Sequence, residues 1–165
     1  MKAQRANPGT LLRIYLNDHL AALGAEVELA RRCGANNRGT DLDYDLSRLV
    51  GELQEDQRHV RQLLERSGMR ESRPKQVLAV LAERIGRLKL NGQLRGYSDL
   101  SRLVELEALC LAAEHRLHLW RSLETRAEHP RLRELPFDEL VEKASRQRQR
   151  LEEHRLDAAR RAFGT

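Results

Sequence analysis

Apolar residues recur at every third or fourth position along most of the chain, as they do in helices with one buried face. No segment alternates polar and apolar residues as a half-buried strand would. The 10 glycines and four prolines lie mainly where the apolar runs begin or end, so they mark helix boundaries. The pattern predicts helices at residues 11–33, 42–67, 74–91, 98–128 and 137–163, and therefore an all-α fold.

Residues suited to capping stand where three of these helices begin. Thr10 precedes the first helix, Thr40 or Asp41 the second, and Ser98 the fourth. Their side-chain oxygens can accept hydrogen bonds from backbone N–H groups that have no partner within the first helical turn. Gly68 follows the second helix, where glycine readily adopts the left-handed conformation that ends a helix.

The lengths of the predicted helices restrict how they can pack. The four longest would each extend about 35–45 Å, at ~1.5 Å per residue. A compact chain of 165 residues has a radius of gyration of only ~15 Å, so helices this long must lie side by side. Short connections within the first and last pairs predict antiparallel neighbours. The longer passage between 67 and 98, which carries the helix at 74–91, lets the chain return along the bundle, and we expect a single domain over residues 1–165.

Composition narrows the class of protein. The chain has no apolar run of the ~18 residues that a membrane-spanning helix needs, so no membrane association is expected. Its two cysteines, Cys33 and Cys110, are too few for a disulfide framework, which favours a reducing, cytoplasmic location. The sequence also lacks the common phosphate-binding, hydrolase, zinc-protease and paired-cysteine motifs, so no enzyme class is indicated.

The net charge of +5 is unevenly distributed. Acidic residues dominate the segment 41–57, and basic residues dominate 70–95. The basic residues of that second segment are Arg70, Arg73, Lys75, Arg84, Arg87, Lys89 and Arg95. A surface with separated charges favours self-association or an oppositely charged protein partner as readily as nucleic acid. The few aromatic residues are scattered, which argues against a platform for stacking bases.

Several polar residues interrupt the apolar faces of the predicted helices. His19 and Glu26 lie within the face of 11–33, and Asp56 lies near the edge of the face of 42–67. Arg155 lies inside the face of 137–163, with Arg148 close by. Because a buried polar group needs a partner, these five residues are predicted to form an interior polar cluster.

Acidic and histidine residues in the middle of a four-helix bundle resemble the ferritin-like superfamily, which holds a di-metal carboxylate site there. In that family two helices each supply a carboxylate, and the other two each supply a Glu-x-x-His pair. Glu26 is similar to the first carboxylate, and Glu107 or Glu114 to that of the third long helix. Asp56 and His59 resemble one of the pairs, with Asp in place of Glu.

The last helix departs from the family pattern. No Glu-x-x-His occurs there, and His154 has no acid at the required spacing. Arg155 stands instead on the inward face, and a guanidinium stays protonated and repels a metal cation. We therefore predict that Arg155, with Arg148, pairs with Glu26 and Asp56, and that no cofactor is bound.

The resemblance and the altered last helix together predict a non-catalytic ferritin-like bundle that acts as an interaction or assembly protein. A homodimer is expected because the apolar stripe of 74–91 requires a cover. The alternative is an iron- or manganese-binding oxidase or stress-protection protein. Its metal ligands would be Glu26, Asp56, His59, Glu114 and His154. A third hypothesis is a nucleic-acid binder that uses the basic segment 70–95.

Overall fold

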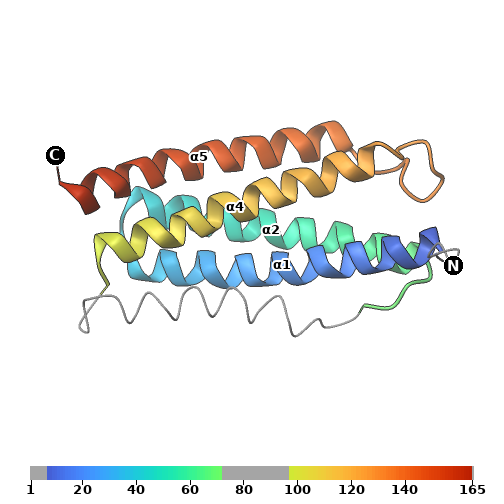
Figure 1. Cartoon of the computed structure of the whole chain (residues 1–165), viewed down its shortest axis with the longest axis horizontal. Coiled ribbons are helices and arrows are strands. Elements are labelled where there is room, and N and C mark those ends of the chain that lie inside the picture. The colour runs from blue at the N-terminus through green and yellow to red at the C-terminus, as the bar shows by residue number, and fades with distance from the viewer. Residues whose placement is uncertain (1–6, 72–96, 165) are drawn as a thin grey trace, which may run out of the picture.

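The computed structural model describes residues 7–71 and 97–164. Within these ranges the chain forms four helices and no strand, which confirms the all-α prediction. The helices are α1 (Pro8–Asn36), α2 (Asp41–Arg66), α4 (Asp99–Glu124) and α5 (Phe137–Phe163), shown in Figure 1. The predicted helix at 74–91 lies outside the described residues. So do all the residues of the predicted basic patch except Arg70.

The helix ends follow local capping chemistry. Thr40 caps α2 and Ser98 caps α4. The side-chain oxygen of each accepts a hydrogen bond from the backbone N–H three residues later, at 3.3 and 3.1 Å respectively. The first helix begins earlier than predicted, because the side chain of Asn7 accepts a hydrogen bond from the backbone N–H of Gly9, at 3.0 Å. The expected cap, Thr10, therefore lies inside α1.

The four helices lie side by side in an elongated bundle (Figure 1). The backbones of α1 and α2 pack closely, as do those of α4 and α5, and α1 also packs against α4. In Figure 1, α2 and α4 begin at one end of the bundle, whereas α1 and α5 begin at the other. Long polar side chains span the gap between α2 and α5.

Leucine side chains from all four helices form most of the core. Leu16, Leu53, Leu106 and Leu151 are buried members from successive helices, and Trp120 is fully buried among them. Burying each such side chain contributes roughly 1.5–3 kcal/mol to folding. Charged residues interrupt every helix, and no helix in the described part of the chain is apolar enough over its length to cross a membrane.

Candidate functional site

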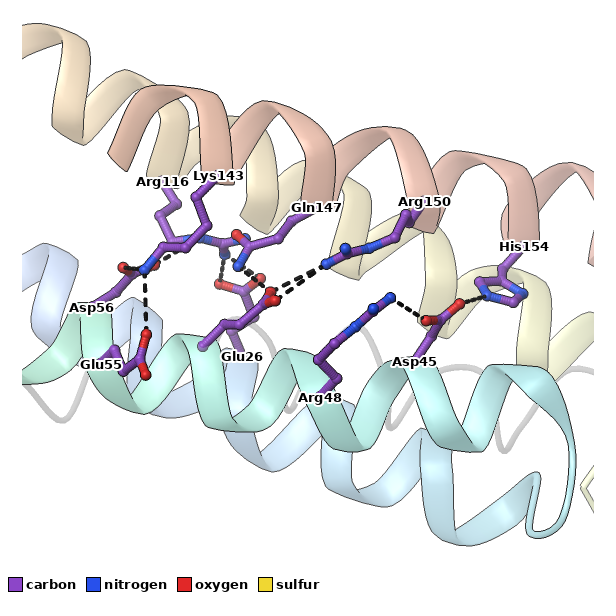
Figure 2. Close-up of polar contacts among 11 residues, drawn as sticks. Glu26, Asp45, Arg48, Glu55, Asp56, Arg116, Lys143, Gln147, Arg150 and His154 are labelled. Atoms are coloured by element: carbon purple, nitrogen blue, oxygen red, sulfur yellow. Dashed lines mark hydrogen bonds and ion pairs between the residues drawn. The ribbon is translucent and has the colours of Figure 1, made fainter. Parts of the chain in front are cut away.

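The centre of the bundle contains a buried ionic cluster around Arg116 of α4, whose side chain is 1% exposed. One guanidinium nitrogen, Nη1, donates to both carboxylate oxygens of Glu26 on α1. The other, Nη2, donates to Oε1 of Gln147 on α5 at 2.7 Å. The Nε atom lies 3.4 Å from a carboxylate oxygen of Asp56 on α2. Figure 2 shows that this single side chain meets residues from the other three helices.

A second cation completes the charge balance. Lys143 of α5 places its Nζ 2.7 Å from Oδ1 of Asp56 and 3.8 Å from Glu55. Asp56 is fully buried, but neither of its oxygens has a hydrogen-bond partner of good geometry within the described residues. Its contacts with Arg116 and Lys143 are therefore mainly ionic. The two buried carboxylates, Glu26 and Asp56, therefore lie against two cations, Arg116 and Lys143.

Burial acts on the acids of this cluster more strongly than their partners do. It raises the pKa of Glu26, whereas the charge and hydrogen bonds of Arg116 oppose that rise. It also raises the pKa of Asp56, and here Lys143 is the stronger opposing charge and Arg116 the weaker one. Removing water from a carboxylate disfavours its charged form, so these acids depend on their cations to stay ionised.

The cluster continues as a row of polar contacts between α2 and α5. Gln147 donates through Nε2 to Glu52 at 2.6 Å, and Arg150 lies 3.1 Å from the same carboxylate. Further along, His154 contacts Asp45 at 2.9 Å. Residue numbers fall on α5 as they rise on α2, so these two helices run in opposite directions. The row connects the buried centre to the partly exposed edge of the bundle (Figure 2).

The predicted cations lie elsewhere. Arg155 pairs with Glu152 on its own helix, 2.6 Å away, and is 25% exposed. Arg148 is half-exposed and pairs with Glu114, 3.3 Å away. The predicted pairing of these two arginines with Glu26 and Asp56 is therefore wrong, and Arg116 takes that role. Both arginines have an acid within reach at the α4–α5 surface, where pairing requires less removal of water than it does in the core.

A pattern in the sequence does point to Arg116. It follows Ala113 by three positions and Leu109 by seven, and it precedes Trp120 by four, so it shares the buried face of α4. Among the buried residues of α4, Arg116 is the basic one, and it was not among the predicted site residues. A search for charged residues at the helical spacing of buried ones would have found it.

The two interior histidines differ in their surroundings. His19 is buried and stacks on the ring of His115, with 3.9 Å between the ring centres, while Tyr15 contacts it edge-on. Burial, helped by the nearby His115, lowers the pKa of His19 to about 3, so its ring is neutral at physiological pH. His59 is partly buried and lies edge-on to Trp120. Burial, together with the nearby charge of Lys143, lowers the pKa of His59, so this ring borders the ionic cluster, whereas His19 serves as a packing group.

A separate polar cluster joins the end of α1 to the start of α4. Tyr97 donates to Glu105 and accepts from the side-chain amide of Asn37, both at 3.0 Å. The hydroxyl of Tyr97 is also 3.6 Å from the sulfur of Cys33, which is fully buried. Burial raises the pKa of the Cys33 thiol to about 12, so it stays protonated and is a poor nucleophile. We interpret this cluster as structural.

The residues do not fit a di-metal centre. Glu26 and Asp56 meet the guanidinium of Arg116, which repels a metal ion. Glu114 and His154 are engaged at other places on the bundle, with Arg148 and Asp45 respectively. Across residues 7–71 and 97–164, no three His, Cys, Asp or Glu side chains are grouped as metal ligands. The five residues of the alternative metal site are therefore not gathered at one place, because Glu114 and His154 lie away from Glu26 and Asp56.

Comparison with known proteins adds no family to this picture. No family model matches the chain, and no curated protein or solved structure matches it. The functional interpretation therefore depends on the geometry of the chain itself.

Proposed function

We propose that this protein is a cytoplasmic, ferritin-like helical bundle without metal chemistry, which works through its surface as an interaction or assembly protein. The observation that carries the proposal is the buried Arg116, which lies between acids of two helices at the centre of the bundle. An arginine fixed by two carboxylates occupies the space and the charge that a cation would need.

Two further features support the ferritin-like assignment. Four long helices lie side by side, and α2 and α4 begin at the same end, as the long connection of that fold requires (Figure 1). The acids at the centre, Glu26 and Asp56, come from α1 and α2. On α5 two groups reach the centre, the cation Lys143 and Gln147, whose neutral amide is a weaker metal ligand than a carboxylate.

Elemental analysis tests the absence of metal. The full chain should be produced with iron and manganese supplied in excess, purified without chelators and analysed for both metals. We expect far less than one metal ion per chain. Near-stoichiometric iron or manganese would contradict the proposal and favour the oxidase or stress-protection alternative.

Sedimentation velocity over a wide range of protein concentrations tests the assembly role. We expect a homodimer that dissociates on dilution, and a monomer at every concentration would contradict self-assembly.

A mobility-shift experiment with duplex DNA at two salt concentrations tests the nucleic-acid hypothesis. Binding that weakens steeply with salt would favour the nucleic-acid hypothesis instead.

A further inference from the structure

The end of the bundle that holds the start of α1 contains a cleft of about 550 Å³. Pocket volumes of roughly 300–1,000 Å³ are typical of small-molecule sites. The cleft lies where α1 begins, α2 ends and the α4–α5 connection turns, three segments that meet at one end of Figure 1. It is remote from the ionic cluster, which occupies the middle of the bundle.

The floor of the cleft is apolar. Leu123 and Leu132 are buried, and Leu12, Tyr15 and Met69 are partly buried beside them. Leu11 extends the apolar surface outward and is 54% exposed. An apolar surface of this kind favours a ligand that carries a hydrocarbon chain.

The rim of the cleft is basic. Arg126, His129 and Arg131 border it, and none of the described lining residues is Asp or Glu. Within the part of the chain that the structure describes, neither arginine side chain forms an ion pair. The backbone N–H of Arg131 donates to Nδ1 of His129, which leaves the proton of a neutral ring on Nε2, where it can donate to a ligand.

The adjoining surface has the same sign of charge. A second, more open hollow shares Gly9 and Met69 with the cleft and is bordered by Arg13 and Arg70. None of the described residues around it is acidic either. The basic border of the cleft therefore continues onto the adjoining hollow, and the residues that line both favour an anionic ligand.

We propose that this cleft binds a long-chain fatty acid, with the hydrocarbon chain on the apolar floor and the carboxylate at the basic rim. The apolar floor is suited to a hydrocarbon chain, and the basic rim favours a ligand whose chain ends in an anionic group. Arginine is suited to this role because its planar guanidinium can form two parallel hydrogen bonds with a carboxylate. The proposal is independent of the metal-free assignment, because it uses none of the residues in the ionic cluster.

The test is a calorimetric titration of the full chain with dodecanoate, at concentrations below those at which dodecanoate forms micelles. We expect saturable binding of one molecule per chain that weakens as salt is added. Dodecyltrimethylammonium, which has the same chain but the opposite charge, should not bind. Non-saturable binding, or equal binding of both compounds, would overturn the proposal.

Matched variants locate the site. Leu11→Glu places a carboxylate at the cleft and should abolish binding, whereas Ile14→Glu should not, since Ile14 is similarly exposed on the same helix but does not line the cleft. Because both positions are exposed, both variants should fold, which circular dichroism would verify. Binding that is unchanged in Leu11→Glu would place the ligand elsewhere and overturn the proposal.

A second pair tests the rim. The double variant Arg126→Gln/Arg131→Gln should bind dodecanoate about three- to tenfold more weakly, as the loss of two exposed ion pairs predicts. Arg133→Gln is the control, because Arg133 is exposed in the same connection but does not border the cleft. If dodecanoate fails to bind but an acidic amphipathic peptide binds in a manner sensitive to the double variant, the occupant is a protein segment and the proposal is wrong.

Discussion

At the scale of single residues, the position of each charge determines what it does. Arg31 and Glu28 form an ion pair on the outside of α1, where water screens the attraction and competes for both groups. Arg116 and Glu26 form theirs in the core, at 1% and 3% exposure. The second pair is strongly interdependent, since neither charge can return to water without opening the bundle.

This contrast predicts different outcomes for two alanine substitutions on α1. Glu26→Ala removes the carboxylate that pairs with the buried guanidinium of Arg116. It should lower the free energy of unfolding by ~3–5 kcal/mol. Glu28→Ala removes an exposed pair and should change it by no more than ~1 kcal/mol. Urea unfolding of both variants measures the difference. Indistinguishable unfolding midpoints would show that Glu26 is not a buried ion-pair partner.

At the scale of helices, the α1–α4 interface combines ring packing with ionic contacts. His19 from α1 and His115 from α4 stack face to face, and burial lowers the pKa of both rings. Two stacked imidazoles cannot both be charged without strong repulsion. At least one ring must therefore be neutral, and burial favours the neutral form of both.

The lowered pKa of His19 predicts how stability depends on pH. The folded pKa of about 3 lies below the unfolded value of 6.5, so the unfolded chain takes up a proton first as the pH falls. The stabilising contribution is complete above about pH 6.5 and is lost as the pH falls toward 3, by up to ~1.4 kcal/mol per unit. Thermal unfolding between pH 7 and 4.5 should show this loss.

The variant His19→Gln isolates the contribution of that histidine. Its side chain has no charge to gain, so its stability should fall less than that of the wild type over the same pH range. The raised pKa values of Glu26 and Asp56 act in the opposite direction, but they are present in both proteins and cancel in the comparison. Parallel pH profiles for the two proteins would contradict the assignment of His19.

At the scale of the whole molecule, Arg116 is a point where all four described helices meet. It belongs to α4 and contacts Glu26 on α1, Asp56 on α2 and Gln147 on α5. The backbones of α2 and α5 are not closely packed, so this group and the polar row beside it connect the two helical hairpins on that side. The loss of Arg116 should therefore affect the whole bundle.

Arg116→Met should lower the free energy of unfolding by ~3–5 kcal/mol, because it leaves Glu26 without its cation and Asp56 with Lys143 alone. Arg155→Met should change it by ~1 kcal/mol or less, since that arginine pairs at the surface with Glu152. Part of the stability of Arg116→Met should return at low pH, where the stranded acids become neutral. A larger loss of stability in Arg155→Met than in Arg116→Met would show that Arg155, and not Arg116, is the cation that pairs with the buried acids.

Features that depend on interactions between residues close together in the sequence could be predicted from the sequence. The caps Thr40 and Ser98 act on backbone groups three residues away, so they can be recognised locally. The start of α1 shows the limit, since Asn7 and Thr10 are both suitable caps and the sequence does not rank them. The burial of Glu26 and Asp56 was predictable from helical periodicity, because that periodicity assigns a face.

The sequence by itself determined that this chain is helical and that acids lie inside the bundle, because both follow from the spacing of residues along one helix. Only the tertiary structure decided which cation meets them. That choice depends on the rotation of each helix, the distance between axes and the reach of each side chain, and these favour Arg116 over Arg155. The same is true of the fatty-acid cleft, whose walls come from segments that are distant in the sequence and adjacent only after folding.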